Sequence, residues 1–191
     1  MCEKWKMDFE KIDGFIKRDI RICLEKNQDD YIERFMILPH RKFNFSAAFF
    51  GSKWFVYRLM LREGVLLWGL DLLVTTFVGT LLTIFGLKKM MNPDSIRKLI
   101  IIGMALVYMI FFFIQGFIAD QIYWKKLKRE LTAFGRKDSN EPASKEEIDK
   151  MKEWTGVSIK SAIFVSVLWG IATNMVYKYI MCPTILWAVS L

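Results

Sequence analysis

Two acidic side chains lie inside long apolar stretches of the sequence, and they are the residues best placed to do chemistry. Asp71 is the only charged residue in 64–87, and Asp120 is the only one in 99–124. A charge in hydrocarbon is costly and usually faces protein or water, so such acids often mark proton or cation pathways. Asp71 therefore suggests such a pathway. If Asp71 is buried, we expect it to be protonated or paired, with Lys160 as the candidate ion partner. A structural hydrogen bond between helices is the alternative interpretation.

Residue patterns typical of catalysis or metal binding are scarce in the rest of the chain. His40 is the only histidine, and the three cysteines lie far apart, whereas a zinc site needs several such side chains together. Asp29 and Asp30 fit a helix start better than a metal or general-base site. The chain has no phosphate-binding loop, dinucleotide fingerprint or nucleophile elbow. We therefore expect no enzymatic activity, no cofactor and no metal.

The elements that must position these residues are three apolar runs, 64–87, 99–124 and 159–181. Hydrophobic residues make up 53% of the 191 residues, and each run is long enough to cross a hydrocarbon core of about 30 Å as a helix. If the runs were buried helices of a soluble protein, too little polar surface would remain to cover them. The sequence therefore predicts an all-α membrane protein with three transmembrane helices.

Basic residues near the ends of the runs orient the helices, because they resist translocation. They favour a cytoplasmic N-terminus, an external loop at 88–98, a cytoplasmic segment at 125–158 and a short external apolar tail at 182–191. The first residues carry charges where a signal peptide would need an apolar core, so we expect no cleaved leader. The net charge of +8 fits anionic lipid headgroups near helix ends, and we do not expect nucleic acid as a partner.

Residues 1–42 are expected to form cytoplasmic amphipathic helices. Apolar residues recur at steps of three and four over Lys4–Leu24, which is typical of one helix face. A second helix is expected from Asp29 or Asp30 to Pro39. These helices could pack together as a small cap, lie on anionic lipid, or bind a partner protein. The sequence leaves the three alternatives open.

Residues 43–63 form an aromatic segment directly before the first span. Aromatic rings and long basic side chains favour a membrane–water boundary, because each has an apolar body and a polar tip. Gly51 and Ser52 permit a bend. We therefore predict a helix or helix-turn that lies at the cytoplasmic boundary or dips into it. The predicted boundary residues are Phe43, Phe45, Phe49, Phe50, Trp54, Tyr57 and Arg58.

Residues 125–158 are expected to hold a cytoplasmic helix and a polar loop. Lys125–Phe134 should extend the second span into water. Ser144 and Glu147 have the spacing of a capping box, which predicts a helix that ends around Trp154. The mixed charges of this segment indicate a solvated face.

The third span carries small or polar side chains at every fourth position, which places them in one stripe along the helix. Such stripes let helix backbones approach closely in lipid, and Asn can form a hydrogen bond across a helix pair. We predict that the stripe contacts either the first two spans or another subunit. Its residues are Ser158, Ala162, Ser166, Gly170 and Asn174.

A signature of eleven residues runs through the aromatic segment. It comprises Phe43, Asn44, Ala47, Ala48, Phe49, Phe50, Gly51, Trp54, Tyr57, Arg58 and Met60. Together with GFIADQIYWKKLKREL and TGVSIKSA further along, it resembles the bacterial domain of unknown function 2628 family of small inner-membrane proteins. Phe45, Ser52 and Asp120 depart from that family's usual Trp, Pro and Asn. The resemblance implies a bacterial inner-membrane location and carries no activity with it.

Three classes of function fit these features. The first is an accessory, scaffolding or regulatory subunit of a larger membrane complex, with no catalysis of its own. The second is a homo-oligomeric small transporter or ion channel that uses Asp71 and Asn174. The third, a membrane enzyme acting on lipid, is disfavoured by the shortage of histidine and paired acids. Expected partners are membrane lipids with anionic headgroups, and a membrane protein or a second copy of the chain.

Overall fold

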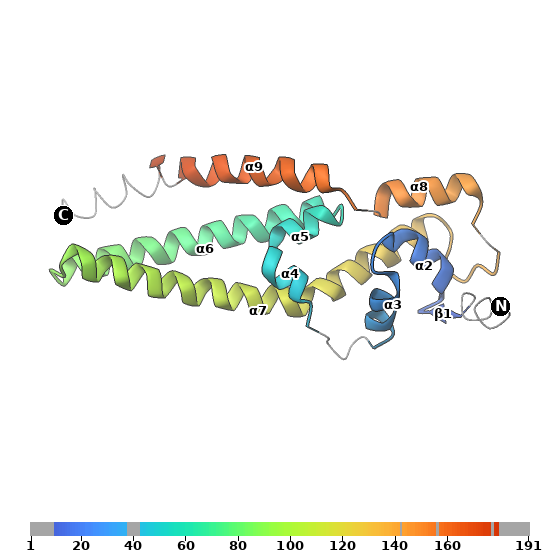
Figure 1. Cartoon of the computed structure of the whole chain (residues 1–191), viewed down its shortest axis with the longest axis horizontal. Coiled ribbons are helices and arrows are strands. Elements are labelled where there is room, and N and C mark those ends of the chain that lie inside the picture. The colour runs from blue at the N-terminus through green and yellow to red at the C-terminus, as the bar shows by residue number, and fades with distance from the viewer. Residues whose placement is uncertain (1–9, 38–42, 142, 156, 177, 180–191) are drawn as a thin grey trace.

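The computed structural model describes residues 10–37, 43–141, 143–155, 157–176 and 178–179. Figure 1 shows an elongated helical molecule with one small hairpin of two strands. The elements in chain order are β1 (Lys11–Ile12), β2 (Phe15–Ile16), α2 (Lys17–Leu24), α3 (Gln28–Ile37), α4 (Phe45–Phe50), α5 (Ser52–Tyr57), α6 (Leu61–Lys88), α7 (Pro93–Ala133), α8 (Lys145–Thr155) and α9 (Ile159–Val176).

Three helical stretches of the described chain are long and apolar enough to cross a membrane, judged by length and composition. They are Leu61–Lys88, Pro93–Ala133 and Lys145–Val176. The first two are α6 and α7, and the third contains α8 followed by the more apolar α9. The predicted all-α membrane protein with three spanning helices is confirmed.

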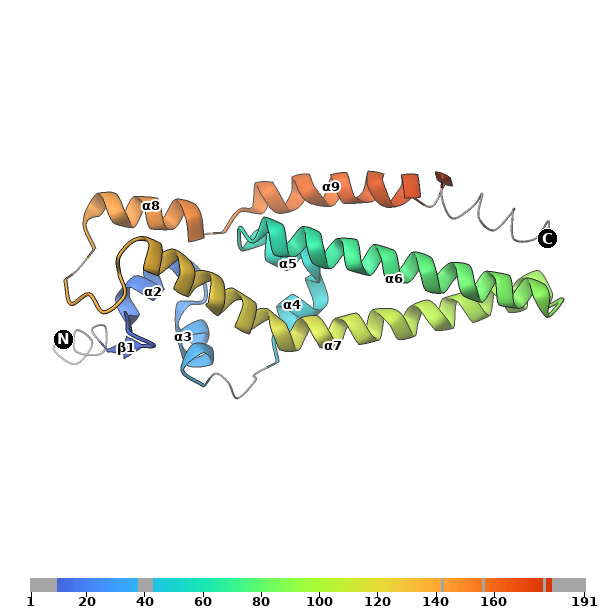
Figure 2. The same cartoon turned by 180° about the vertical axis from the view of Figure 1, so that it is seen from behind.

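The helices α6 and α7 form an antiparallel hairpin, seen from both sides in Figures 1 and 2. Asn92 caps the start of α7, because its Oδ1 accepts a hydrogen bond from Ser95 N at 2.8 Å. Pro93 occupies the first turn, where its missing amide donor costs nothing. Ile96 packs against Gly86, where an added Cβ would lie 2.7 Å from Ile96 Cγ1. The two helices therefore approach closely near the hairpin tip.

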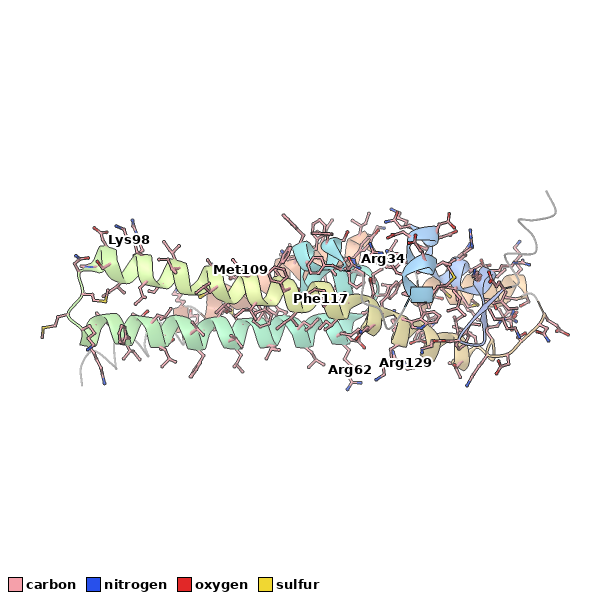
Figure 3. All side chains as sticks on the ribbon, turned by 90° about the horizontal axis from the view of Figure 1, so that it is seen from below. Arg34, Arg62, Lys98, Met109, Phe117 and Arg129 are labelled. Carbon is pink, nitrogen blue, oxygen red and sulfur yellow. The ribbon has the colours of Figure 1, made fainter. Side chains whose placement is uncertain are left out.

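The helix α7 continues far beyond the hairpin. Its 41 residues extend over about 60 Å, roughly twice the thickness of a hydrocarbon core. The exposed large apolar residues of α7 end at Phe117, and from Ala119 onward other elements cover one side of it. Figure 3 shows Met109 and Phe117 between Lys98 at the hairpin tip and Arg129 at the far end. The apolar half of the molecule therefore ends near Phe117.

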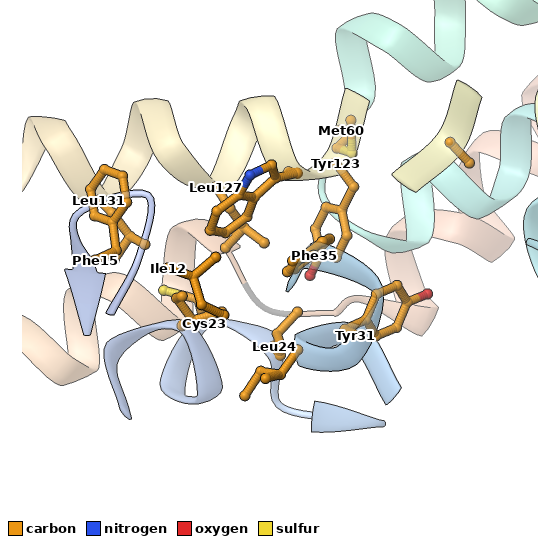
Figure 4. Close-up of a cluster of buried hydrophobic side chains, with 14 of the residues drawn as sticks. Ile12, Phe15, Cys23, Leu24, Tyr31, Phe35, Met60, Tyr123, Leu127 and Leu131 are labelled. Carbon is orange, nitrogen blue, oxygen red and sulfur yellow. The ribbon is translucent and has the colours of Figure 1, made fainter. Parts of the chain in front are cut away.

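The polar half, which we call the cap, consists of β1, β2, α2, α3, α8 and the part of α7 from Ala119 to Ala133. One hydrophobic cluster contains residues from each of these elements. In Figure 4, Phe35 of α3 lies beside Tyr123 of α7, and the Phe35 ring also stacks on Trp124 with centroids 4.6 Å apart. The apolar faces of α2 and α3 are therefore buried inside the protein. The cap interpretation is confirmed, and a helix lying on lipid is wrong for these residues.

The predicted helix over Lys4–Leu24 is confirmed for Lys17–Leu24, which form α2, and is wrong for residues 10–16. The strands β1 and β2 pair in an antiparallel hairpin, and α2 begins only after it. The turn residues Asp13 and Gly14 have φ angles of 52° and 87°. This left-handed conformation is what a two-residue Asp-Gly turn between strands requires. The turn chemistry overrides the helical spacing of the apolar residues; residues 1–9 lie outside the described part.

A buried ion pair anchors the connection between α7 and α8. Arg136 Nε lies 2.8 Å from Asp19 Oδ2, and both side chains are almost fully buried. The prediction of a solvated face is therefore wrong for Arg136. Ser144 and Glu147 form the predicted capping box, because Glu147 N donates to Ser144 Oγ and Ser144 N donates to Glu147 Oε2. The helix that follows ends at Thr155, one residue beyond the predicted end.

Candidate functional site

The aromatic segment forms the short helices α4 and α5, which meet in a bend at Gly51. The φ angle of Gly51 is +57°, and a Cβ there would also lie 2.9 Å from Gln115 Oε1 of α7. The position therefore suits glycine on two grounds, and the predicted bend is confirmed. On the outer side of α4, Phe45, Phe49 and Phe50 are exposed. Their location at a membrane boundary stays a prediction.

Two of the predicted boundary residues, Trp54 and Arg58, do not lie on the outer surface of the segment. Their side chains are 4% and 3% exposed and lie in the protein interior. The helix α5 packs against α4, α6 and α9, so the residues on its inner side are covered by other helices of the chain. Phe43 and Tyr57 are half-buried. The aromatic segment thus has an outward group and an inward group, which composition alone does not separate.

One face of α7 receives the aromatic segment over two successive turns. Three contact pairs, which we call the joint, are Phe43 with Gly116, Asn44 with Asp120, and Arg58 with Tyr123. The three α7 residues follow the spacing i, i+4 and i+7, which places them on one helix face. The joint fastens the segment between the cap and the first span to the second span.

At the first pair, the Phe43 ring lies against Gly116 so closely that an added Cβ would collide with it. Asn44 N donates a hydrogen bond of 2.9 Å to Gly116 O. The Phe43 ring also meets Phe117 edge-on, with centroids 5.0 Å apart. The chain entering α4 is therefore held against the backbone of α7.

At the second pair, Asn44 Nδ2 donates to Asp120 Oδ1 at 2.6 Å, while Asn44 Oδ1 accepts from Ala47 N and caps α4. Arg34 Nη1 lies 3.1 Å from Asp120 Oδ2, and Arg34 Nε lies 2.8 Å from Asp30 Oδ2. Burial opposes the charge of Arg34, but its bonds to the two acids outweigh burial and raise its pKa. Asp120 is therefore held by the protein's own side chains and not by lipid headgroups.

At the third pair, Arg58 is enclosed by aromatic rings. Arg58 Nη1 donates to Leu24 O at 3.2 Å and to Tyr123 Oη at 3.4 Å. The guanidinium carbon lies 4.5 Å from the centroid of Tyr31 and 5.1 Å from that of Tyr123. Burial favours the neutral form of Arg58, but the two tyrosines outweigh burial and raise its pKa, so Arg58 keeps its charge.

Lys126 secures the junction between α5 and α6. Its Nζ donates to Arg58 O at 3.1 Å, to Leu59 O at 3.0 Å and to Trp154 O at 3.2 Å. Arg58 and Leu59 follow the last turn of α5, and Trp154 lies in the last turn of α8. One buried ammonium group thus satisfies carbonyls from two segments that are distant in sequence.

A cavity of about 800 Å³, which we call the inner cavity, opens between α9 and the α6–α7 hairpin. Its polar lining residues are Asp71, Tyr108, Gln115, Ser166, Thr173 and Asn174, and Lys53 and Ser52 line it as well. Asp71 and Asn174, which the sequence singled out separately, therefore share one cavity. Among the described residues, Asp71 Oδ1 is buried without a hydrogen-bond partner. No ion pair joins Asp71 to Lys160 in the described chain, so the candidate pairing is wrong.

The predicted packing stripe of α9 does not press against another helix along its length. Ser166, Gly170 and Asn174 line the inner cavity, and a Cβ built on Gly170 would meet no described atom within 4 Å beyond its chain neighbours and its own helix backbone. Ala162 lines a second cleft nearer the cap. Only the start of the stripe is held, because Ser158 N donates to Tyr57 O at 2.9 Å. As an intrachain contact surface, the stripe is therefore wrong at Gly170.

The helix α9 is attached by its packing against α5 and by one aromatic pair. Trp169 is the buried residue among those described in this helix, and its ring stacks on Trp68 with centroids 5.3 Å apart and planes 3° apart. Apart from this stack and the contact with α5, the helix exposes large apolar residues. The tail at 182–191 and the end of the third span after Tyr179 lie outside the described residues.

The sequence analysis did not single out Arg34, Tyr31 or Lys126, whereas Tyr123 lies in the segment GFIADQIYWKKLKREL that carries part of the family resemblance. Arg58 at the end of an aromatic run was a usable signal, because a buried guanidinium needs aromatic or carbonyl partners. Cys23 is buried in the cap, and burial raises its pKa to about 12. Within the described ranges, no group of three or more His, Cys, Asp or Glu is close enough to hold a metal ion.

The helices and the joint define a helical membrane protein whose second span extends into a folded cap and holds the aromatic segment before the first span. The family described as Protein of unknown function (DUF2628) matches residues 19–129. The chain belongs to this family, so the predicted resemblance is confirmed. A search of curated proteins and a search of solved structures found no match. The matched range contains both sides of the joint. In the joint, Phe43, Asn44 and Arg58 of the signature contact α7.

Proposed function

We propose that the protein is a non-catalytic accessory or regulatory subunit of a larger complex in the bacterial inner membrane, with its cap in the cytoplasm. The observation that carries this proposal is the inner cavity. Gly170 leaves it open on the α9 side, and Asp71 and Asn174 offer polar groups on opposite walls. In lipid such groups need polar partners, because the hydrocarbon supplies none.

A transmembrane helix of a partner protein is the occupant that meets both requirements. Small residues on α9 let a second backbone approach, and a polar side chain of the incoming helix would bond to Asp71 or Asn174. The stack of Trp68 on Trp169 keeps α9 beside α6 while the rest of the interface stays open. The cap and the joint hold the three helices in position, and we assign them the structural role.

Site-specific photocrosslinking in the native host tests this proposal. A photoreactive phenylalanine analogue replaces Thr173, which is exposed and lines the inner cavity, or Leu73, which is exposed on α6 and does not. We expect Thr173 to give an adduct with one discrete protein and Leu73 to give none. In a Gly170→Leu background the Thr173 adduct should disappear, because the leucine fills the cavity. Identical products from both positions would contradict the proposal.

A second candidate function is a small homo-oligomeric transporter or channel. The observation in its favour is that Asp71 and Asn174 line the same cavity, together with Gln115 and Tyr108. Purified protein in liposomes should then conduct ions, and Asp71→Asn should alter that conductance. Thr75, one turn further along the same helix, gives the control Thr75→Ala. Liposomes that stay tight would remove this candidate.

A further inference from the structure

A second cleft, which we call the basic cleft, is lined by residues of α5 and of the start of α9. Figure 1 shows these two helices side by side near the border between the apolar half and the cap. The volume of the basic cleft is about 760 Å³. It shares Phe50, Lys53 and Ser166 with the inner cavity but extends toward the connection between α2 and α3. Arg58 belongs to the joint and also lines this cleft.

The charges of the basic cleft are all of one sign. Its cations are Lys26, Lys53 and Arg58, and none of the described residues that line it is acidic. Lys26 and Lys53 are exposed, so their ammonium groups are free to follow a ligand. Arg58 is 3% exposed, and its Nε is buried with no hydrogen-bond partner among the described residues. A buried donor without a partner is costly, which favours a ligand with an acceptor oxygen.

The remaining walls divide by chemistry. Toward the cap the lining residues are Tyr31, Trp54 and Tyr57, which offer ring faces and hydroxyl groups. Along α9 the lining residues are Ile159, Ile163 and Val167, which are aliphatic and continue into the apolar half. A ligand that fits both ends has an anionic head and a hydrocarbon tail. Lys and Arg attract anionic headgroups at a membrane surface, and guanidinium and ammonium groups bond strongly to phosphate.

We propose that the basic cleft binds one anionic phospholipid, with its phosphate between Lys26, Lys53 and Arg58 and an acyl chain along Ile163 and Val167. This site is distinct from general headgroup attraction, because a defined cavity and a buried arginine select one molecule. It is a different site from the one assigned to the partner helix, although Phe50, Lys53 and Ser166 line both cavities.

Native mass spectrometry of the delipidated full chain tests the site. The protein in detergent is titrated with dioleoylphosphatidylglycerol or, for comparison, dioleoylphosphatidylcholine. We expect a single tightly retained phosphatidylglycerol per chain. The double variant Lys26→Gln with Lys53→Gln should weaken its retention by about tenfold or more. The matched control is Arg62→Gln with Lys125→Gln, which removes two exposed cations that do not line the cleft.

A second pair of variants probes the cleft without changing charge. Ala162→Trp fills the cleft and should abolish retention, whereas Ala172→Trp, on the same helix and outside the lining, should leave it unchanged. Equal retention of both lipids, equal loss in both charge variants, or no effect of Ala162→Trp would overturn the proposal. Displacement of the lipid by inorganic phosphate alone would also overturn it, because the site would then take a free anion.

Discussion

Asn44 and Asp120 lie 76 positions apart in the chain and are joined by a hydrogen bond of 2.6 Å between Asn44 Nδ2 and Asp120 Oδ1. Asn44 caps α4 with its other side-chain atom, so this bond ties the start of the aromatic segment to the middle of α7. Arg34 on α3 binds the second carboxylate oxygen of Asp120. One buried acid therefore connects the cap, the aromatic segment and the second span.

Replacing Asp120 separates the contributions of its charge and its shape. Asp120→Leu leaves the buried Asn44 Nδ2 without its acceptor and leaves Arg34 with Asp30 as its acid partner, so it should lower the free energy of unfolding by about 1–3 kcal/mol. Asp120→Asn keeps an acceptor for one of them and should cost less. Denaturant unfolding in one detergent measures both. Asp149→Asn, on the exposed side of α8, is the control and should change stability by less than about 0.5 kcal/mol. Equal effects of Asp120→Leu and Asp149→Asn would contradict the network.

Arg58 should not be replaceable by lysine. Arg58→Lys removes the planar group that lies over Tyr31 and the Nη1 donor to Leu24 O and Tyr123 Oη. We expect a loss of about 2 kcal/mol in the free energy of unfolding. Arg62→Lys, at an exposed position four residues later, should cost less than about 0.5 kcal/mol. Equal free energies of unfolding for the two variants would contradict this expectation, because they would show that Arg58 contributes only its charge.

Replacement by alanine should lower the stability of the protein at Gly51 and raise it at Gly69. Gly51→Ala places a Cβ at φ +57° and 2.9 Å from Gln115 Oε1, so the variant should lose about 1–2 kcal/mol of stability. Gly69→Ala lies within α6, where the new Cβ meets no described atom within 4 Å beyond its chain neighbours and its own helix backbone, and should gain up to about 1 kcal/mol of stability. Thermal unfolding of both variants checks the signs. A stable Gly51→Ala protein would show that the bend between α4 and α5 is not fixed.

Much of the fold follows from patterns within single segments. The three spans, the helix after Gln28 and the helix after Ser144 depend on apolar length and on caps, which are local signals. The Asp13-Gly14 turn was equally local, but the helical spacing around it concealed the hairpin. Length and caps predict where an element lies along the chain, and they do not predict which side of it is covered.

The candidate site depended on contacts that no single segment encodes. Trp54 and Arg58 match a membrane boundary by composition, and only the packing of α5 against its neighbours turns them inward. The network around Asp120 brings together three distant segments. Gly170 belongs to a regular stripe, yet the position of α9 leaves it open to a cavity. Asp71 and Asn174 were named from the sequence, but their common cavity needed the arrangement of three helices.

Cys23 should be unreactive while the protein is folded. Its pKa of about 12, against an ordinary value of 9.0, leaves very little thiolate near neutral pH, and burial excludes reagents. In a Cys2→Ser, Cys182→Ser background, maleimide labelling should be slow until denaturant is added. Rapid labelling of the folded protein would show that the cap opens readily.

The same thiol should make stability depend on pH in the alkaline range. Because the pKa of Cys23 is raised in the folded state, the unfolded chain releases this proton first as the pH rises above 9.0. The stability that the protonated Cys23 thiol gives to the folded state is fully present below pH 9.0. Above pH 9.0 it falls by about 1.4 kcal/mol per pH unit toward pH 12. Comparison with Cys23→Ala isolates the effect from tyrosine and lysine titration. Parallel stability curves for the two proteins would contradict burial of the thiol.

The most direct test of the accessory role is native mass spectrometry of the tagged chain, extracted from its own host in a mild detergent. We expect a defined complex with another membrane protein. Gly170→Leu should dissociate it, and Gly69→Leu, which lies outside the inner cavity, should not. A chain that appears only alone or as a homo-oligomer, or a complex that survives Gly170→Leu, would contradict the assignment of the inner cavity to a partner helix.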